Sequence, residues 1–175
     1  MNTMTIPSQG PWNLPEVAYH YFYGGELSSF AATPGLLLPE AWCGHPSPAP
    51  LVEVPTIEHW WQAIKSTMPQ DFDWVLSAPT AAKAKRRGGP RGEDGRKITL
   101  REDWEEVKVA AMRYGHGKKH EMPRYRNVLP ATADRILVED SPTDPIWGGR
   151  DRQGGYEGQN LLGIVLMEVR AEQQS

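Results

Sequence analysis

Alternating and apolar stretches predict strands of a small sheet. In residues 17–23 the bulky side chains of Val17, Tyr19, Tyr21 and Tyr23 fall on one side of an extended chain, and two glycines end the pattern. Residues 135–139 also predict a strand, and the short apolar stretch at residues 51–54 fits a further one. We expect an antiparallel sheet built around residues 17–23 and 135–139.

Apolar side chains at helical spacing predict a helix over residues 56–68. Thr56 follows Pro55 and is a typical N-cap. One apolar stripe contains Ile57, Trp60, Trp61 and Ile64. A polar stripe beside it contains Glu58, Gln62 and Lys65. The helix should therefore bury its apolar stripe in the core.

Two further helices are predicted in the second half of the chain. The spacing of Thr99 and Glu102 matches a capping box, and Gly115 is a typical end of the helix that follows. Its buried face would contain Trp104, Val107, Ala111 and Tyr114. Residues 160–171 are so apolar that their helix must lie deep in the core. Its residues Leu162, Val165 and Leu166 should be inaccessible to solvent.

The predicted elements fit one compact, helix-rich α+β domain over residues 16–172, preceded by an irregular arm at residues 1–15 that is rich in proline. Of the 175 residues, 39% are hydrophobic, which is enough to bury a core. No stretch approaches the roughly 18 consecutive apolar residues of a membrane span. The first residues also lack the charged-then-apolar order of a signal peptide. We therefore expect a cytoplasmic protein with no membrane partner.

The net charge of −3 is distributed unevenly. Residues 83–101 contain eight basic and two acidic residues, which gives this segment +6 and the remainder −9. A local basic stretch suggests attraction to phosphate groups, whereas its five Gly and Pro residues also fit a solvated loop. We expect Lys83 and Arg87 to line a site, and residues 88–97 to form a mobile loop at its mouth.

Several common catalytic and metal-binding patterns are missing. Cys43 is the only cysteine, which excludes an intrachain disulfide and a cysteine-rich zinc site. Cys43 and His45 leave a catalytic pair open, although a bystander role fits them as well. His116 and His120 have the spacing of two metal ligands, but the glycines beside His116 should interrupt the helix that would align them. We therefore expect no metal site.

Three stretches concentrate polar residues beside bulky aromatic ones. Residues 58–62 place Glu58 in the first turn of a helix, residues 139–149 form an acidic loop that ends in Trp-Gly-Gly, and residues 158–163 contain Asn160. Each stretch also has a purely structural explanation. Glu58 can be a surface residue favoured by the helix dipole, the acidic loop can be a capped turn, and Asn160 can cap the last helix.

These stretches and three others, in this order, resemble one family. The matching residues are Leu27-Ser28-Ser29-Phe30, residues 55–65, Pro79 with Ala82-Lys83 and Arg87, residues 104–108 with Met112, Asp144 with Trp147-Gly148, and residues 158–163 with 166–170. Together they look like the NADAR domain, also called the YbiA-like or RibX-like family, over nearly the whole chain. This chain differs in having Arg86 before Arg87, a longer segment between Phe30 and Pro55, and an expanded segment at residues 88–101.

The resemblance implies an N-glycosidase. Some members of the family cleave ribosylamino-pyrimidine intermediates of riboflavin synthesis, and others remove ADP-ribose from modified guanine in nucleic acid. The family's functional positions match here at Glu58, Trp104 and Asp144, which the resemblance implies are catalytic. Substrate binding is expected at Lys65, Lys83, Arg87, Trp147, Gly148 and Asn160, with Lys65 or Lys83 as the lysine that the resemblance places near the phosphate end.

The chemistry of C–N cleavage agrees with these residue types. A cation-like sugar transition state needs a fixed carboxylate, and we expect the helix dipole to keep Glu58 ionised. The expected partner is an ADP-ribosyl or ribosyl-phosphate nucleotide or an ADP-ribosylated nucleic acid, and no cofactor is implied. Two alternatives stay open at this point. One is a module that binds NAD or ADP-ribose without turnover, and the other is a nucleic-acid-binding protein that acts through residues 83–101.

Overall fold

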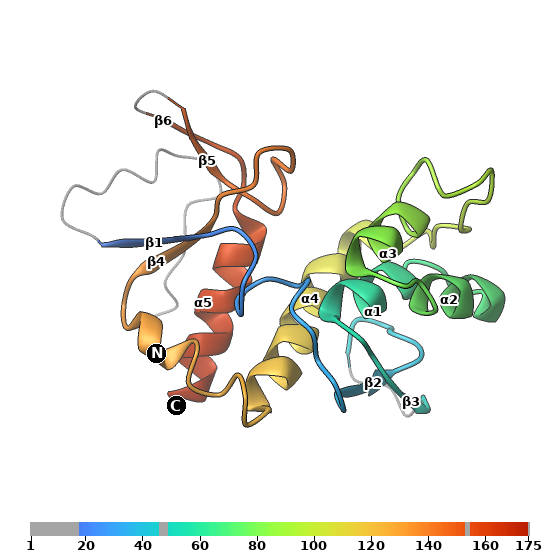
Figure 1. Ribbon diagram of the computed structural model, residues 1–175, viewed down its shortest axis with the longest axis horizontal. Coiled ribbons are helices and arrows are strands. Elements are labelled where there is room, and N and C mark those ends of the chain that lie inside the picture. Colours follow the sequence, from blue (N-terminus) through green and yellow to red (C-terminus); the bar gives the residue numbers. More distant parts are fainter. Residues whose placement is uncertain (1–17, 46–48, 153–154, 175) are drawn as a thin grey trace.

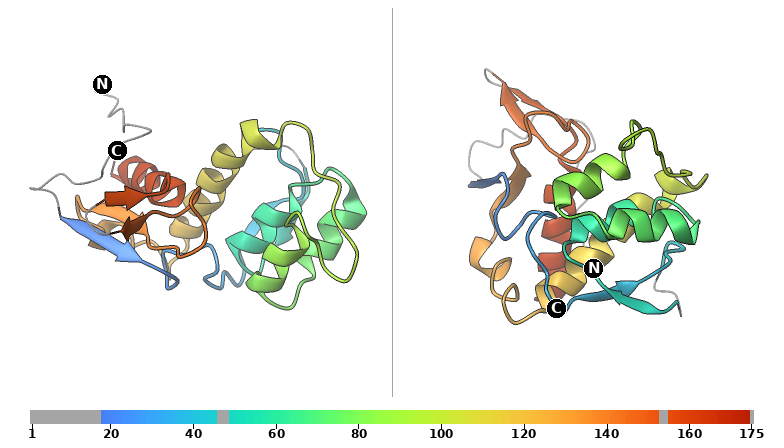
Figure 2. Two further views of the ribbon diagram at one scale, coloured as in Figure 1. Left: turned by 90° about the horizontal axis from the view of Figure 1, so that it is seen from above. Right: turned by 45° about the vertical axis from the view of Figure 1, so that its right-hand side comes forward.

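The computed structural model describes residues 18–45, 49–152 and 155–174. Figures 1 and 2 show two groups of elements with one long helix, α4 (Trp104–Glu121), between them. The first group contains β1 (Tyr19–Phe22), β4 (Ile136–Glu139) and α5 (Leu161–Gln173). The second contains α1 (Ile57–Ala63), α2 (Pro69–Leu76) and α3 (Ala81–Arg87). Because α4 packs against both α1 and α5, it connects the two groups. The predicted arm, residues 1–15, lies outside the described residues.

The predicted α+β class is confirmed, but the orientation of one strand pair is wrong. Strands β1 and β4 do pair, and they run parallel, with Tyr19 opposite Ile136 and Phe22 opposite Glu139. Parallel strands need a long crossover connection, and the chain between β1 and β4 supplies it through helices α1–α4. The antiparallel pairs are β2 (Leu37–Pro39) with β3 (Leu51–Glu53), and β5 (Arg150–Arg152) with β6 (Gly155–Glu157).

Helix α1 begins as predicted and ends sooner. The Thr56 side chain accepts a hydrogen bond from the backbone N–H of His59 at 3.2 Å, which caps the helix. The helix closes with Ile64 as its C-cap, and Met68 precedes a separate helix, α2, that begins with Pro69. The predicted helix over residues 56–68 is therefore replaced by α1 and the connection to α2.

Helix α4 differs from its prediction at both ends. It begins at Trp104, and Thr99 lies before it with its N–H bonded to the Asp71 carboxylate at 2.8 Å. It continues through Gly115 to Glu121. A Cβ at Gly115 would lie 3.2 Å from the Trp60 ring. The glycine thus allows α4 to approach α1 closely, and packing outweighs its poor helix propensity.

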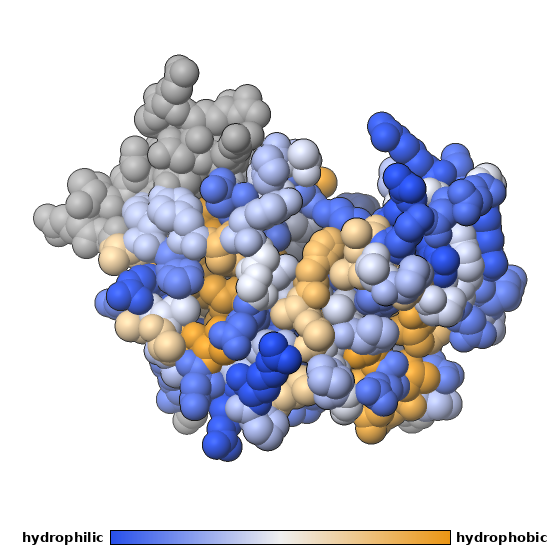
Figure 3. Space-filling view, in the orientation of Figure 1, coloured by the Kyte–Doolittle hydropathy of each residue, from blue (hydrophilic) through white to orange (hydrophobic). Residues whose placement is uncertain are grey.

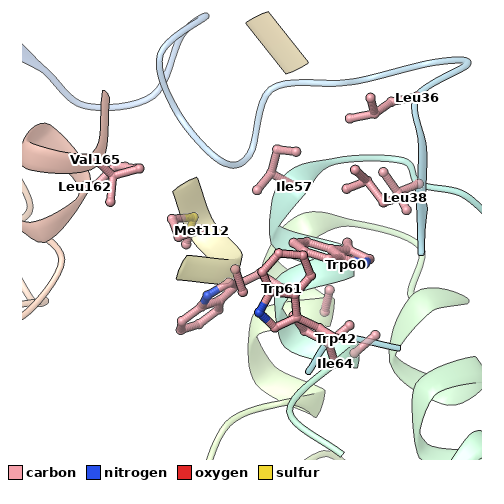
Figure 4. Close-up of a cluster of buried hydrophobic side chains, with 14 of the residues drawn as sticks. Leu36, Leu38, Trp42, Ile57, Trp60, Trp61, Ile64, Met112, Leu162 and Val165 are labelled. Atoms are coloured by element: carbon pink, nitrogen blue, oxygen red, sulfur yellow. The ribbon is translucent and has the colours of Figure 1, made fainter. Parts of the chain in front are cut away.

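The core extends through both groups of elements. Figure 4 shows Ile57, Trp60 and Trp61 of α1, with Ile64 at its C-cap, in one cluster with Met112 of α4. The remaining prediction for the core concerns α5. Its residues Leu162, Val165 and Leu166 are fully buried, as predicted.

The surface of the molecule is polar at one end. Figure 3 shows hydrophilic residues over α2, α3 and the segment that follows α3. The structure contains no helix, among the described residues, that is long and apolar enough to cross a membrane.

Candidate active site

Helix α1 carries a carboxylate into the interior. Glu58 is 6% exposed and its Oε1 accepts a hydrogen bond from Gln62 Nε2, one turn later, at 2.7 Å. The backbone N–H of Glu58 donates to the carbonyl oxygen of Ser29 at 3.0 Å. Burial raises the pKa of Glu58, against the opposing effects of Gln62, Lys85 and Lys65. Loss of hydration is therefore the largest influence on this carboxylate, and it acts against the ionised form that the sequence led us to expect.

A row of three tryptophans lies beside this helix. The Trp61 ring centroid is 4.8 Å from that of Trp104 and 5.1 Å from that of Trp147, both in edge-to-face contact. Trp104 is 5% exposed, whereas Trp147 is only half-buried. The row therefore offers a planar group mainly the face or edge of Trp147, with Trp61 and Trp104 behind it.

Lys65 packs on this row. Its Nζ lies 4.5 Å from the Trp61 ring centroid and 5.5 Å from that of Trp104, and it donates to the carbonyl oxygen of Gly88 at 3.3 Å. Burial lowers the pKa of Lys65 to about 8, although Glu58 acts in the opposite direction. The ammonium is thus partly desolvated and close to the buried carboxylate.

The loop after β4 holds Asp144 through its own backbone. Asp144 Oδ1 accepts the N–H groups of Ile146 at 3.2 Å and Trp147 at 3.0 Å, and its Oδ2 lies 3.5 Å from Lys85 Nζ. A Cβ at Gly148 would lie 2.5 Å from the Ser141 side chain, so the loop can close only with glycine at that position. The acidic stretch is therefore a tight turn that places Trp147 in the tryptophan row.

Asn160 supports the same loop from inside. It is 0% exposed, its Oδ1 accepts the N–H of Glu139 at 3.0 Å, and its Nδ2 donates to the carbonyl oxygen of Leu137 at 2.8 Å. No side-chain bond caps α5. The amide of Asn160 is thus used within the protein, where it fixes the end of β4, and the side-chain helix cap offered by the sequence is not formed.

Two charged residues that the sequence did not single out belong to this group. Glu139 is the last residue of β4, and Lys85 is on α3. Burial raises the pKa of Glu139 to about 7; Asp144 and Glu58 contribute in the same direction and Lys85 opposes them. Lys85 is 52% exposed and lies 5.9 Å from the ring of Phe30. The sequence features that could have identified them are the position of Glu139 at the end of a strand and that of Lys85 on a short helix with Thr80 as its N-cap.

Lys83 and Arg87, the other cations of the predicted site, form ion pairs with Glu93. Lys83 Nζ lies 2.6 Å and Arg87 Nε 2.7 Å from the two carboxylate oxygens of Glu93. Arg87 also donates to the carbonyl oxygen of Trp74 at 2.6 Å. Residues 88–97, which were expected to form a mobile loop, are thus linked to α3 through the buried Glu93. Glu93 forms ion pairs with the same two side chains that were expected to bind phosphate.

A buried basic network lies behind the segment that contacts Glu58. Lys119 is 0% exposed and donates to the carbonyl oxygens of Glu26 at 2.6 Å and Ser28 at 2.8 Å. His116 Nε2 lies 3.1 Å from Ser29 Oγ. Burial lowers the pKa of Lys119 to about 7. These side chains of α4 therefore fix the loop whose Ser29 carbonyl receives the N–H of Glu58.

The remaining candidates for metal binding or covalent chemistry are two histidines of α4 and the pair of Cys43 and His45. The rings of His116 and His120 stack 6.0 Å apart on the uninterrupted α4 helix. Cys43 is exposed, and its sulfur lies 3.7 Å from the ring nitrogens of His45. Within the described ranges, no three or more His, Cys, Asp or Glu residues are placed to share a metal ion.

Comparisons with known proteins agree with one another. The model of the NADAR domain matches residues 38–174. N-glycosidase YbiA of Escherichia coli is 33% identical over 150 residues, which are 85% of this chain and 81% of that protein. An N-glycosidase of Nostoc punctiforme is 37% identical over 123 residues, 67% of this chain and 72% of that protein.

A plant relative and a solved structure add to these matches. The chloroplastic riboflavin biosynthesis protein PYRR of maize is 40% identical over 125 residues, which are 67% of this chain and 19% of the maize protein, so the match covers about a fifth of that relative. The NMR structure of the E. coli protein YbiA superimposes with a TM-score of 0.68 and 29% identity, and covers 97% of this chain and 94% of that one.

Proposed function

This chain belongs to the NADAR domain family, and from that premise we propose that it is an N-glycosidase, a hydrolase that cleaves the bond between a ribosyl C1′ and a base nitrogen. Two substrate classes fit: a ribosylamino-pyrimidine phosphate of riboflavin synthesis, and ADP-ribosylated guanine, free or in nucleic acid. The observation that carries the proposal is the buried Glu58 carboxylate, held on a rigid helix within electrostatic reach of Lys65, Lys85 and Asp144.

Burial of Glu58 favours the transition state over the ground state. As the C–N bond breaks, positive charge develops on the sugar, and a poorly hydrated carboxylate gains more from that charge than a hydrated one. Lys65 and Lys85 favour the ionised form that this role requires. Thr56, Ser29 and Gln62 hold the side chain and its helix in place, so little reorganisation is needed.

The base and the phosphate groups would bind on either side of this carboxylate. We assign the stacking surface to Trp147, because it is the most exposed ring of the tryptophan row, with Trp104 as its buried support. Phosphate groups would meet Lys85, which is exposed, and Lys65. Lys83 and Arg87 could assist only by leaving Glu93.

The test is product analysis on both substrate classes. The protein should release the free base and a ribosyl product from at least one of them, as separated by chromatography. Binding of ADP-ribose without cleavage of either substrate would instead support the binding module. Affinity for nucleic acid that falls steeply with salt, again without cleavage, would support the nucleic-acid-binding alternative.

A further inference from the structure

The carboxyl groups of Glu58, Asp144 and Glu139 lie within electrostatic reach of one another. Two of them, those of Glu58 and Asp144, accept hydrogen bonds from the protein. Asp144 Oδ1 receives two backbone N–H groups and its Oδ2 faces Lys85. Glu58 Oε1 receives Gln62 Nε2. A carboxylate that accepts hydrogen bonds from N–H donors is stabilised as the anion. Glu58 and Asp144 therefore already use carboxylate oxygens to accept hydrogen bonds from the protein.

Glu139 is different. Its backbone is fixed on both sides, because its N–H donates to Asn160 Oδ1 at 3.0 Å and its carbonyl oxygen accepts the N–H of Gly149 at 2.8 Å. Its carboxyl group is partly buried and receives no hydrogen bond from any residue that the structure describes. The charged groups that face it are Asp144, Lys85 and Glu58. Two of these three are acidic, so a proton on Glu139 relieves repulsion.

Cleavage of a C–N bond needs such a proton, because the departing base nitrogen takes the bonding electron pair. Resting on the function proposed above, we propose that Glu139, and not Asp144, is the catalytic acid that protonates the departing base. Asn160 and Gly149 are positioning residues, since they fix the strand end that carries Glu139. The elevated pKa of about 7 agrees with this role, because a general acid works best when it titrates near the working pH.

The step balances as a hydrolysis. The C1′–N bond breaks, its electron pair stays on nitrogen, and that nitrogen takes the proton of the Glu139 carboxyl group. A water oxygen bonds to C1′ and the Glu58 carboxylate accepts the proton that this water loses. Transfer of one proton through solvent from Glu58 to Glu139 restores both groups. The sum is one water consumed, one C–OH formed and one N–H formed.

The test is the pH dependence of kcat/KM for Glu139→Gln and Asp144→Asn, on whichever substrate class the wild-type protein cleaves. For the wild type we expect kcat/KM to fall as the pH rises above about 7. Glu139→Gln should be about 10²-fold less active near neutral pH, by analogy with the loss of other general acids, and should lack this alkaline fall. Asp144→Asn should keep the fall, whatever its activity. The exposed neighbour Asp140→Asn is the matched control, with wild-type kinetics.

The outcomes separate the two proposals. If the wild-type protein cleaves neither substrate class, the proposed function itself is refuted. An active wild type whose Glu139→Gln variant keeps both its rate and its alkaline fall overturns the role of Glu139 alone. Loss of the fall in Asp144→Asn, with its retention in Glu139→Gln, overturns that role as well and assigns the proton to Asp144. Thermal unfolding of each variant shows that it is folded.

Discussion

Replacing Glu139 with Gln should stabilise the protein at pH 8 and leave its stability in acid unchanged. Burial, followed by the charge of Asp144, raises the pKa of Glu139 from 4.5 to about 7. In the unfolded chain this group loses its proton near pH 4.5. Between pH 4.5 and 7 the native state therefore binds more protons than the unfolded state, and the free energy of unfolding of the wild type falls as the pH rises. Gln carries no charge and avoids this loss.

The magnitude follows from the difference between the two pKa values. At about 1.4 kcal/mol per pH unit, the ionised Glu139 costs the native state up to about 3 kcal/mol above pH 7. Its partial exposure screens the charge, so we expect a gain of about 1–3 kcal/mol for the Gln variant. In a domain of this size, this gain corresponds to a Tm increase of roughly 2–12 °C.

Urea unfolding followed by circular dichroism at pH 4, 6 and 8 measures this gain directly. It should be near zero at pH 4, intermediate at pH 6 and complete at pH 8. Asp140→Asn, an exposed change of the same kind at the adjacent position, should show no such progression. A gain for Glu139→Gln that is equal at all three pH values, or a loss at pH 8, would refute the reasoning.

Three further predictions test the packing, the buried basic network and the stacking surface. Gly163→Ala should lower the free energy of unfolding by about 1–3 kcal/mol, because its Cβ would lie 2.1 Å from the carbonyl oxygen of Leu137. Gly117→Ala has open space around its Cβ and should raise the free energy of unfolding by about 0.5–1 kcal/mol. Urea unfolding that shows a change of the same sign for both variants would contradict this. Burial, followed by the charge of Lys119, lowers the pKa of His120 from 6.5 to about 4. Between pH 4 and 6.5 the unfolded chain therefore binds more protons than the native state. The free energy of unfolding should fall by up to about 3 kcal/mol as the pH drops from 6.5 to 4. His120→Gln should flatten this fall, and an unchanged slope would count against it. Trp147→Ala should raise the Kd of the bound nucleotide roughly 5- to 150-fold in calorimetry, as for the loss of one stacked base; an unchanged Kd would exclude stacking on this ring.

The sequence predicts the elements that depend on local signals. Thr56 and the apolar stripe of α1 identify that helix, and the apolar residues of α5 identify a helix whose Leu162, Val165 and Leu166 are buried, although α1 is buried along its whole length. The orientation of β1 and β4 could not be obtained in this way, because it depends on the path of the four helices between them. The length of α4 was underestimated for a related reason: Gly115 is a poor helix former by itself, and only its contact with Trp60 shows why the helix continues.

The candidate site follows the same division. The family resemblance identified Glu58, Asp144 and Trp147, whose neighbourhood the structure describes. Local sequence could not show that Glu58 and Gln62 of α1 are buried, and so it did not indicate that burial raises the pKa of Glu58. It also could not decide which basic residue of α3 faces the acids. Lys83 and Lys85 are two positions apart on one short helix, and the structure pairs Lys83 with Glu93 and Lys85 with Asp144.

The most direct test of the proposed N-glycosidase activity measures release of the free base from the candidate substrates by the wild type and by Glu58→Gln. The variant keeps the shape of the side chain and can still accept the hydrogen bond of Gln62, but it removes the charge. We expect kcat to fall by about 10²-fold or more, with thermal stability equal to or above that of the wild type, because an unfavourably buried charge is gone. Glu106→Gln, an exposed glutamate in the first turn of α4, should leave both quantities unchanged. Near-wild-type turnover by a folded Glu58→Gln variant would contradict the account.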